Sequence, residues 1–165
     1  MRFALMDNDS DWARLSKQDK ECYPPHSQFS EASYLRLYNE GVHSWLLVGA
    51  DDCWIGNVQV LRMKMPAFRA MEETDDADIL KRFLSIFGRR KFNYITGITV
   101  FKGKQGKGFG SLLLSFALAM YSGSHVARIW AMNQASIRLF LRHGFRIEGS
   151  EHVGEQCWTW HVLER

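Results

Sequence analysis

The sequence has little proline and little cysteine: only 3 of its 165 residues are proline and 3 are cysteine. The cysteines, Cys22, Cys53 and Cys157, are odd in number and far apart, so they show neither the pattern of a disulfide framework nor a Cys-x-x-Cys zinc motif. We therefore expect free thiols, no metal site and a reducing, cytoplasmic location.

Long apolar runs are also missing. The longest nearly uncharged run, residues 109–126, is interrupted by glycine and serine, whereas a membrane span needs about 20 mainly apolar residues. Residues 1–12 carry one arginine and three aspartates without the apolar core of a signal peptide. These patterns predict no membrane-spanning segment, no secretory leader and no membrane partner.

A strong excess of one charge is absent as well. Lysine and arginine number 21 against 18 aspartates and glutamates, which gives a net charge of +3. A dedicated nucleic-acid binder usually carries a strongly basic face. We therefore expect no nucleic-acid partner, although a local basic pocket for a small anion remains compatible with this charge.

What is present is an ordinary globular composition, with 46% hydrophobic and 24% charged residues. A chain of this length buries roughly 68–70% of its unfolded surface, which is enough for one core. The sequence therefore predicts a single domain over residues 1–165.

The pattern of apolar residues and breakers predicts mixed α/β (α+β) structure. Proline and glycine separate the elements, and an Asp51-Asp52 pair predicts the turn of a hairpin. Strands are expected at residues 2–6, 44–49, 54–65, 94–101, 126–131, 145–153 and 156–163. Helices are expected from residue 9 or 10 to 22, from 30 to 41, and at 109–121 and 134–143. The order of these elements predicts a mixed sheet flanked by helices.

Residues 67–90 are predicted to be a helical insertion. Acidic residues stand at the front of its apolar pattern and basic residues at its end, which complements the helix dipole. We expect this segment either to close over a binding site and set its specificity or to pack as a structural or dimer-forming helix.

A glycine-rich loop follows the strand at 94–101. It runs over Lys102–Gly108 and leads into the helix that begins at Phe109. Glycines allow the backbone to approach a ligand closely, and the first amides of a helix bind anions. Lysines at 102, 104 and 107 add positive charge. The stretch therefore predicts a phosphate or pyrophosphate site, the alternative being a plain strand-to-helix turn.

Two common phosphate motifs do not fit this loop. A Walker loop needs Gly-Lys-[Ser/Thr], but Phe109 follows Gly108. A dinucleotide fingerprint needs Gly-x-Gly-x-x-Gly and an acid about 20 residues later, and neither is present between Gln105 and Arg142.

A third pattern fits, and through it the sequence resembles the GNAT family of acyl-CoA N-acetyltransferases. Gln105–Gly110 matches the acetyl-CoA loop [Arg/Gln]-x-x-Gly-x-[Gly/Ala], with Val100 five residues upstream. A second family pattern, Asn-x-x-[Ala/Ser]-x-x-x-[Tyr/Phe]-x-x-x-Gly-Phe, is met by Asn133, Ser136, Phe140, Gly144 and Phe145. The motifs cover residues 98–111 and 133–145, while the element order extends the resemblance over most of the chain.

The resemblance implies a mostly antiparallel sheet, acetyl-CoA as co-substrate and an amine-bearing acceptor, either a small molecule or a peptide. It implies that the backbone of Ile98 and Val100 pairs with the pantetheine arm, in a slot where the strands at 94–101 and 126–132 splay apart. The residues whose amides would hold the pyrophosphate are Gln105, Gly106, Lys107, Gly108, Phe109 and Gly110, and Ser111 is a further expected cofactor-binding residue. The residues that would border the thioester are Asn133, Ser136 and Phe140. Whether the protein forms a homodimer is left open.

No catalytic residue stands out. Many family members carry a glutamate on the strand before the loop, but residues 94–100 contain no acid. Deprotonating a lysine amine at pH 7 costs roughly 4.6 kcal/mol, whereas an α-amine costs about 1 kcal/mol. Candidate bases are Glu72, Glu73, Asp75, His125, Glu148 and Glu151. An alternative for His125 is a surface position at the start of a strand. Tyr94 and Tyr121 are candidates for the group that gives a proton to the departing sulfur.

The sequence is compatible with two alternative functions. Without a catalytic acid, and with Phe140 where many relatives have tyrosine, the protein could bind CoA as a non-catalytic sensor or scaffold. Lys107–Gly110 also matches the opening of an RNA-recognition motif, but Ser111 and Leu114 stand where base-stacking aromatics are needed. Stabilisation by acetyl-CoA rather than by single-stranded RNA separates these readings.

Overall fold

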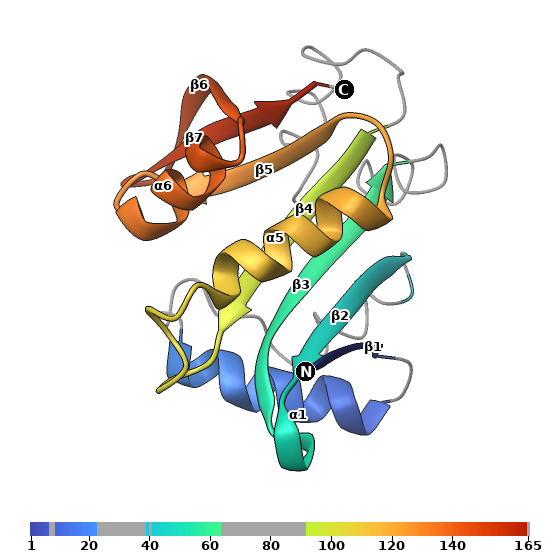
Figure 1. Ribbon diagram of the computed structural model, residues 1–165. Helices are drawn as coiled ribbons and strands as arrows, with labels where there is room; N and C mark the ends of the chain where they lie inside the picture. The colour runs from blue at the N-terminus through green and yellow to red at the C-terminus, as the bar shows by residue number, and fades with distance from the viewer. Residues whose placement is uncertain (7–8, 23–38, 40, 64–91, 165) are drawn as a thin grey trace. The chain divides into compact units, whose positions relative to one another are not determined.

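The computed structural model describes residues 1–6, 9–22, 39, 41–63 and 92–164. The elements that it defines in this part of the chain are β1 (Arg2–Leu5), α1 (Asp9–Cys22), β2 (Val42–Val48), η2 (Ala50–Asp52), β3 (Trp54–Met63), β4 (Phe92–Val100), α5 (Phe109–Met120), β5 (His125–Trp130), α6 (Gln134–Arg142), β6 (Arg146–Val153) and β7 (Gln156–Leu163) (Figure 1). The helix expected at 30–41 and the insertion 67–90 lie outside the described residues, apart from residues 39 and 41.

Within the described residues the strands form one seven-stranded sheet in the order β1-β2-β3-β4-β5-β7-β6. β4 and β5 run parallel, while β1 and β2, β5 and β7, and β6 and β7 are antiparallel pairs. The predicted mixed, mostly antiparallel sheet flanked by helices is therefore confirmed.

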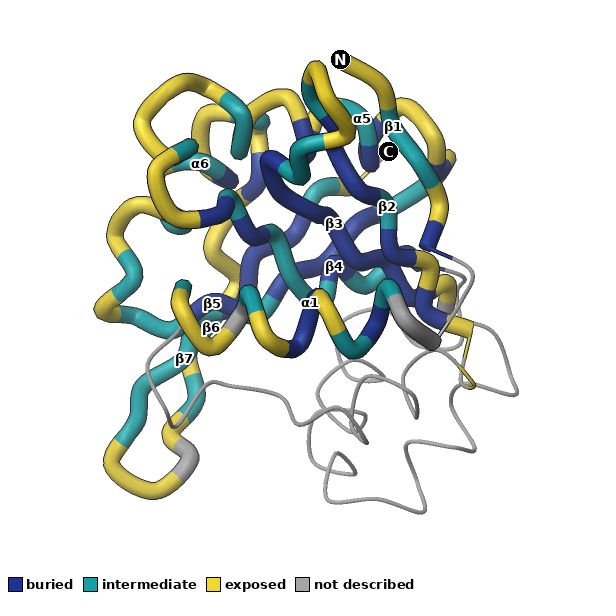
Figure 2. The backbone as a smooth tube through the Cα atoms, turned by 90° about the horizontal axis from the view of Figure 1, so that it is seen from below, coloured by how far each residue is buried: buried dark blue, intermediate teal, exposed yellow. Residues whose placement is uncertain are grey.

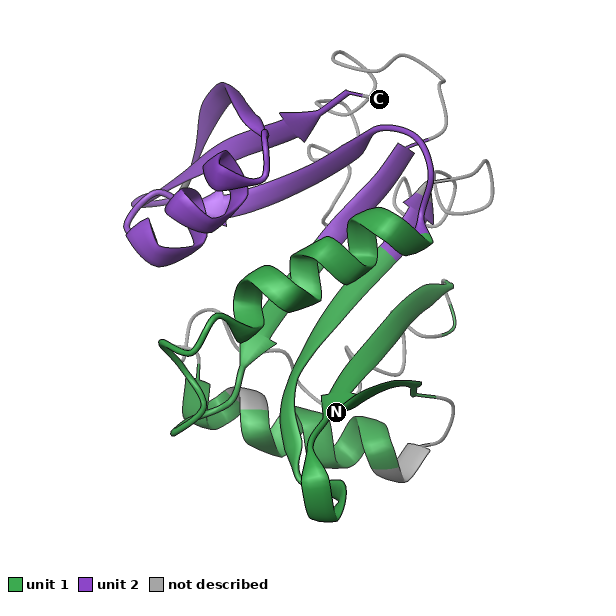
Figure 3. Cartoon of the chain, viewed as in Figure 1, with its two compact units in different colours: residues 1–60, 96–120 green, residues 61–95, 121–165 purple. Residues whose placement is uncertain are grey.

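The chain divides into two compact units, coloured green and purple in Figure 3. Unit 1 comprises Met1–Val60 and Thr96–Met120, and unit 2 comprises Leu61–Ile95 and Tyr121–Arg165. Strands β3 and β4 each contribute to both units. The buried positions follow the strands, as the dark tube in Figure 2 shows.

In unit 1, a helix packs on each face of the strands. Neighbouring residues of a strand point to opposite faces, so the contacts of consecutive residues show which helix lies on which face. Leu46 of β2 packs in a buried cluster with Trp12 and Leu15 of α1. The preceding residue, Trp45, contacts Phe116 of α5 with ring centroids 5.2 Å apart. Phe3 of β1 stacks on the same Phe116 ring at 3.7 Å. Helices α1 and α5 therefore lie on opposite faces.

In unit 2, β5 lies between β4 and β7. Its ladder with β4 consists of three pairs, Asn93–Ile95 with His125–Ala127. Its ladder with β7 runs along the whole strand, from His125 opposite Leu163 to Trp130 opposite Trp158. Helix α6 covers one face of these strands, since Phe140 of α6 lies 6.1 Å from the ring of His161 on β7.

The turn predicted at Asp51-Asp52 is present as the short 3-10 helix η2 between β2 and β3. Both aspartates adopt the left-handed backbone region, with φ of 56° and 52°. Aspartate tolerates this region better than most residues with a Cβ atom. The pair that predicted the turn therefore also explains its geometry.

Candidate functional site

The loop between β4 and α5 has an open, left-handed backbone. Gly103, Gly106 and Gly108 have φ of 77°, 75° and 82°, a region that side chains with a Cβ atom rarely adopt. A Cβ atom at any of the three would meet no other atom within 4 Å. The loop backbone is therefore accessible to a ligand, as the phosphate-site prediction requires.

Hydrogen bonds hold the loop against the end of β4. The amide of Lys104 donates to the carbonyl of Phe101 at 2.9 Å. The side-chain Nε2 of Gln105 donates to the carbonyl of Val100 at 3.1 Å, and Sγ of Cys22 lies 4.0 Å from the same oxygen. Gln105, the first residue of the predicted cofactor motif, thus fixes the loop through its side chain, a role that the motif alone did not indicate.

Helix α5 begins directly after the loop. The amide of Leu112 donates to the carbonyl of Gly108 at 3.1 Å, so the helical hydrogen bonds start there. The amides of Phe109, Gly110 and Ser111 belong to the first turn, where a helix offers no carbonyl partners of its own. Together with the positive end of the helix dipole, these amides form a suitable place for an anion.

The second motif builds the start of α6. Oδ1 of Asn133 accepts a hydrogen bond from the amide of Ser136 at 3.1 Å, which is the geometry of an N-cap. The carbonyl of Asn133 accepts from the amide of Ile137 at 3.0 Å. The asparagine and the small residue three positions later are therefore explained by helix capping, whatever else they bind.

The same motif also ends α6. The amide of Gly144, with φ of 86°, donates to the carbonyl of Leu141 at 3.0 Å, and the amide of Phe145 donates to that of Phe140 at 3.2 Å. These bonds form a Schellman motif, which is completed by a hydrophobic contact. Here the rings of Phe140 and Phe145 supply it, with centroids 4.8 Å apart.

Phe140 is buried and faces a buried histidine. His161 of β7 has no solvent-exposed surface, and its Nε2 lies 2.9 Å from Oγ1 of Thr159. Because that hydroxyl donates its hydrogen to the carbonyl of Ile129 at 3.1 Å, it accepts from Nε2–H. Nδ1 of His161 is buried and has no hydrogen-bond partner among the described residues. Burial lowers the pKa of His161 from 6.5 to about 4, so the ring is neutral at pH 7.

The candidate bases differ in their surroundings. Glu148 forms an exposed ion pair with Arg146 at 3.1 Å. Glu151 pairs with Arg128 at 2.5 Å and is 21% exposed. Glu72, Glu73 and Asp75 lie outside the described residues.

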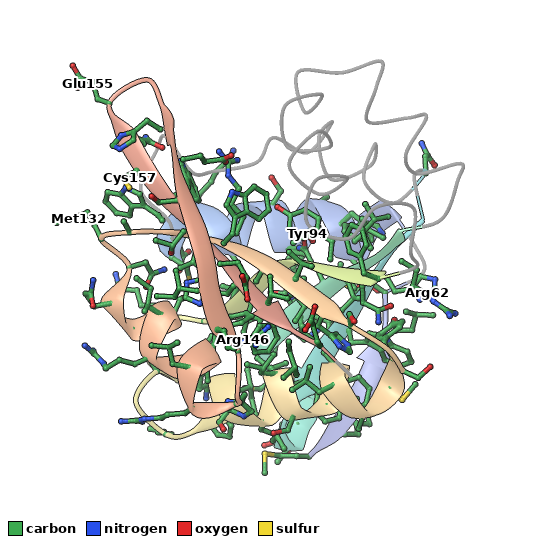
Figure 4. All side chains as sticks on the ribbon, turned by 90° about the horizontal axis from the view of Figure 1, so that it is seen from above. Arg62, Tyr94, Met132, Arg146, Glu155 and Cys157 are labelled. Atoms are coloured by element: carbon green, nitrogen blue, oxygen red, sulfur yellow. The ribbon has the colours of Figure 1, made fainter. Side chains whose placement is uncertain are left out.

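The expectation that His125 is a surface residue is wrong, because its exposed fraction is 0%. As the first residue of β5 it pairs with Asn93 on one side and with Leu163 on the other, so it lies inside the sheet and not at its edge. Of the two candidate tyrosines, Tyr121 is buried, while Tyr94 on β4, labelled in Figure 4, is half-buried.

Unit 1 also contains a row of neutral polar side chains, of which Ser44, Asn57 and Gln59 are buried and Thr96 is half-buried. Nδ2 of Asn57 lies 3.5 Å from Oγ of Ser44, and Oγ1 of Thr96 donates to Oε1 of Gln59 at 3.4 Å. Oδ1 of Asn57 is buried, and no residue in the described part of the chain forms a hydrogen bond with it. These groups can form hydrogen bonds, but none can act as a strong base at neutral pH.

The predicted cofactor residues fall in both units. Ile98 to Ser111 belong to unit 1, whereas Asn133, Ser136 and Phe140 belong to unit 2. The loop before α6 also exposes Met132, which is 71% accessible and points outward (Figure 4). The assignment of these residues to acetyl-CoA stays a prediction.

The part of the chain that the structure describes contains no group of three or more histidine, cysteine or acidic side chains that could hold a metal ion. None of the helices found there combines the length and the apolar character needed to cross a membrane.

A comparison of the sequence with family models identifies the family of the chain. The model of the acetyltransferase (GNAT) family matches residues 11–145. No curated protein sequence matches the chain.

Among solved structures, NAA60 of Arabidopsis thaliana in complex with acetyl-CoA is similar, with a TM-score of 0.71 and 20% identity over 99% of this chain and 98% of that one. The NatC complex bound to Gag peptide and CoA has a TM-score of 0.68 and 15% identity over 100% and 99% of the two chains. A chimera of spermidine N-acetyltransferase SpeG from Vibrio cholerae and hSSAT has a TM-score of 0.67 and 14% identity over 99% and 96%.

Proposed function

The chain belongs to the acetyltransferase (GNAT) family, and we propose that it transfers an acetyl group from acetyl-CoA to an amine. The observation that carries this proposal is the loop of unit 1, in which an open glycine backbone leads directly into the first turn of α5. We also propose that the chain is a single acetyltransferase domain, because the family match extends over residues 11–145.

The loop residues fit the charged part of acetyl-CoA. Amides of Gly108, Phe109 and Gly110 would bind pyrophosphate oxygens, with Lys102 and Lys107 exposed nearby in the sequence to balance the charge. Bound acetyl-CoA supplies an acetyl thioester, whose C–S bond breaks as the N–C bond to the acceptor forms, while the amine proton passes to solvent and CoA leaves as its thiolate. The protein's task is then to hold the amine neutral and in position.

We further propose that the acceptor is an α-amine, such as the N-terminus of a peptide. The carboxylates of Glu148 and Glu151 are both engaged in ion pairs, and the described part of β4 carries no acid. An α-amine with a pKa near 7.7–8.0 needs little help from a base, whereas an amine with a pKa near 10.4 needs a strong one. Relatives that bind a peptide and relatives named for spermidine both occur among the similar structures, so both acceptor classes belong in the test.

The test is to incubate the protein with acetyl-CoA and a panel of acceptors, and to measure release of free CoA thiol. The panel contains short peptides with a free N-terminus, the same peptides with a blocked N-terminus and an internal lysine, and spermidine. We expect turnover with the free N-termini only. Turnover confined to spermidine would overturn the α-amine assignment, and no turnover with any amine would overturn the transferase assignment.

A non-catalytic CoA-binding protein is the second candidate, and Phe140 is the observation that favours it. Phe140 is buried against Phe145 and His161 and has no proton to give to a leaving thiolate. If the site works without this proton, Phe140→Tyr changes turnover by less than about tenfold. A gain of a hundredfold or more would show that an effective acid is missing, and would favour the sensor.

A further inference from the structure

Arg128 stands in the middle of β5, a strand that is otherwise largely apolar. Its side chain is 14% exposed and pairs through Nε with Oε1 of Glu151 at 2.5 Å. The guanidinium also lies 4.5 Å from the ring centroid of Trp158 and 5.9 Å from that of Trp160. Stability alone does not explain an arginine in this position, because a buried ion pair adds little to the net free energy of folding.

The group occupies the face of unit 2 that points away from α6. Thr159 and His161 lie on the α6 face of β7, as the contact of His161 with Phe140 shows. Their neighbours Trp158 and Trp160 therefore point to the other face, where they are opposite Trp130 and Arg128 of β5. Glu151 of β6 is opposite Trp158. In a sheet, residues directly opposite each other share a face, so these side chains form one cluster.

Tyr94 extends the cluster toward β4. It is paired with Val126 in the parallel ladder, and Val126 lies two residues before Arg128 on the same face of β5. β5 then leads into the capping residue Asn133, whose amide donates to the carbonyl of Trp130 at 2.8 Å. The arginine is therefore within one strand length of the residues predicted to border the thioester.

The hydrogen-bonding capacity of Arg128 is largely unused. A guanidinium has five N–H donors, and Nε forms an ion pair with Glu151 but no hydrogen bond with any described residue. The four hydrogens of the two Nη atoms have no hydrogen-bond acceptor among the residues that the structure describes. Stacking on Trp158 fixes the plane of the group and leaves this two-nitrogen edge as a fork that matches a carboxylate.

We propose that Arg128 binds a carboxylate side chain of the acceptor, so that the protein selects peptides with an aspartate or glutamate close to the α-amine. This inference rests on the proposed function and specifies its substrate class. Glu151 holds the guanidinium in place as its ion-pair partner, and Trp158 provides the ring over which it lies. Because the group is mostly removed from water, its interaction with an anion is stronger than at an exposed site.

The experiment compares peptide pairs that differ only in Asp against Asn, or Glu against Gln, at each of the first three positions. We expect kcat/KM for the acidic peptide at the position read by Arg128 to be at least about tenfold higher, as for a charge-assisted hydrogen bond. Equal kcat/KM values within all pairs would overturn the proposal.

Three variants assign the preference to this cluster. Arg128→Lys keeps the charge but loses the fork, so the acidic preference should fall about tenfold while the KM for acetyl-CoA stays unchanged. Arg146→Lys is the matched control, because Arg146 forms ion pairs at 64% exposure, and it should retain the preference. Glu151→Gln keeps the size of the side chain and removes the negative charge beside the guanidinium, so the preference should rise several-fold.

Glu151→Gln keeps the test decisive if Arg128→Lys fails to fold. If the ion pair were purely structural, Glu151→Gln would show the same preference for acidic peptides as the unaltered protein. If no peptide is acetylated, the proposed acetyltransferase activity is contradicted, whereas the role of Arg128 in binding is still untested. Binding of the same peptide pairs to the CoA-loaded protein, measured by calorimetry, then decides the role of Arg128. Equal affinities within each pair would contradict it.

Discussion

At the scale of single residues, the two amide side chains in the cofactor motifs have tasks within the fold. Gln105 donates to Val100 and closes the loop, while Asn133 accepts from Ser136 and caps α6. A residue type that a family motif retains can therefore serve folding and binding at once. Substitution of either residue will not by itself show that it touches acetyl-CoA, so the binding test belongs at a position without such a bond.

Gly108 is such a position, and Gly108→Asp should strongly weaken acetyl-CoA binding. A carboxylate about 5 Å from a pyrophosphate charge costs about 3 kcal/mol at an effective dielectric constant of about 20, or roughly a hundredfold in affinity. Calorimetric titration of the folded variant with acetyl-CoA measures the effect.

The control for this variant is Gly123→Asp. Gly123 also has a positive φ, 95°, and open space around a Cβ atom, but it lies between α5 and β5 instead of in the loop. Gly123→Asp therefore introduces the same backbone strain as Gly108→Asp but places no carboxylate in the glycine-rich loop. Affinity close to that of the unaltered protein in Gly108→Asp would remove the loop from the binding site.

His161 should make the protein less stable as the pH falls from 6.5 to 4. The pKa of this histidine is about 4 in the folded protein against 6.5 ordinarily, because burial opposes its charged form. Between these values the unfolded chain binds a proton that the folded protein does not. The free energy of unfolding should therefore drop by about 3 kcal/mol from this residue alone, and the loss should level off below pH 4.

Urea unfolding between pH 7 and pH 4 measures this contribution. His161→Gln keeps a donor for Thr159 but cannot titrate, so its stability should fall less steeply with decreasing pH. His152→Gln, at an exposed position on β6, should leave the slope unchanged. Parallel pH profiles for the unaltered protein and His161→Gln would disprove the assignment.

At the scale of elements, α6 is fixed at both ends by bonds that its own sequence encodes. The cap at Asn133 and the Schellman motif at Gly144 explain most of the Asn-x-x-Ser…Phe-x-x-x-Gly-Phe pattern without any ligand. The predicted bounds of this helix differ from the observed ones by one residue. Local bonds of this kind can be predicted from sequence because all partners lie within six residues of one another.

Gly144→Ala should destabilise the protein by about 1 kcal/mol. The φ of 86° is costly for any residue with a Cβ atom, while the nearest atom to that Cβ, Cδ1 of Leu163, is at an ordinary 3.6 Å. Gly97→Ala is a matched control, since its nearest atom, Oε1 of Gln59, is also at 3.6 Å but its φ is not in the left-handed region. Chemical unfolding of both variants should show a loss only for Gly144→Ala; equal stabilities would refute the strain argument.

Strand bounds were harder to predict than α6, because partners distant in sequence decide them. β4 begins at Phe92, two residues earlier than predicted, although Asn93 has a low strand propensity. The Nδ2 of Asn93 donates to the carbonyl of Ser122 at 3.1 Å and its amide donates to that of Ser124 at 2.9 Å. Such contacts override the local preference and could not be seen in the sequence.

The same limit applies to the candidate site. The loop motif predicted where the glycines bend, and the structure shows that open backbone. The cluster around Arg128 depends on the register of β5, β6 and β7, which no local pattern specifies. Its one sequence signal was an arginine within an apolar strand.

At the scale of the whole molecule, acetyl-CoA should raise the melting temperature by about 5–10 °C at a concentration of 100 times its Kd. Binding to the folded state alone adds about 2.7 kcal/mol at that concentration, and 1 kcal/mol corresponds to roughly 2–4 °C for a chain of this size. Circular dichroism measures the shift. A single-stranded RNA of the same concentration should leave the melting temperature unchanged; a shift by RNA alone would contradict the proposed function.

The division of β3 and β4 between the two units has a consequence for how the protein is made. The chain passes from one unit to the other three times, after residues 60, 95 and 120. On the ribosome, the second segment of unit 1 is therefore synthesised only after residues 61–95, which belong to unit 2. These residues then wait for the final 45 residues, 121 to 165, which take about 2–9 s to add at bacterial or eukaryotic rates. No single cut can release either unit as an uninterrupted chain.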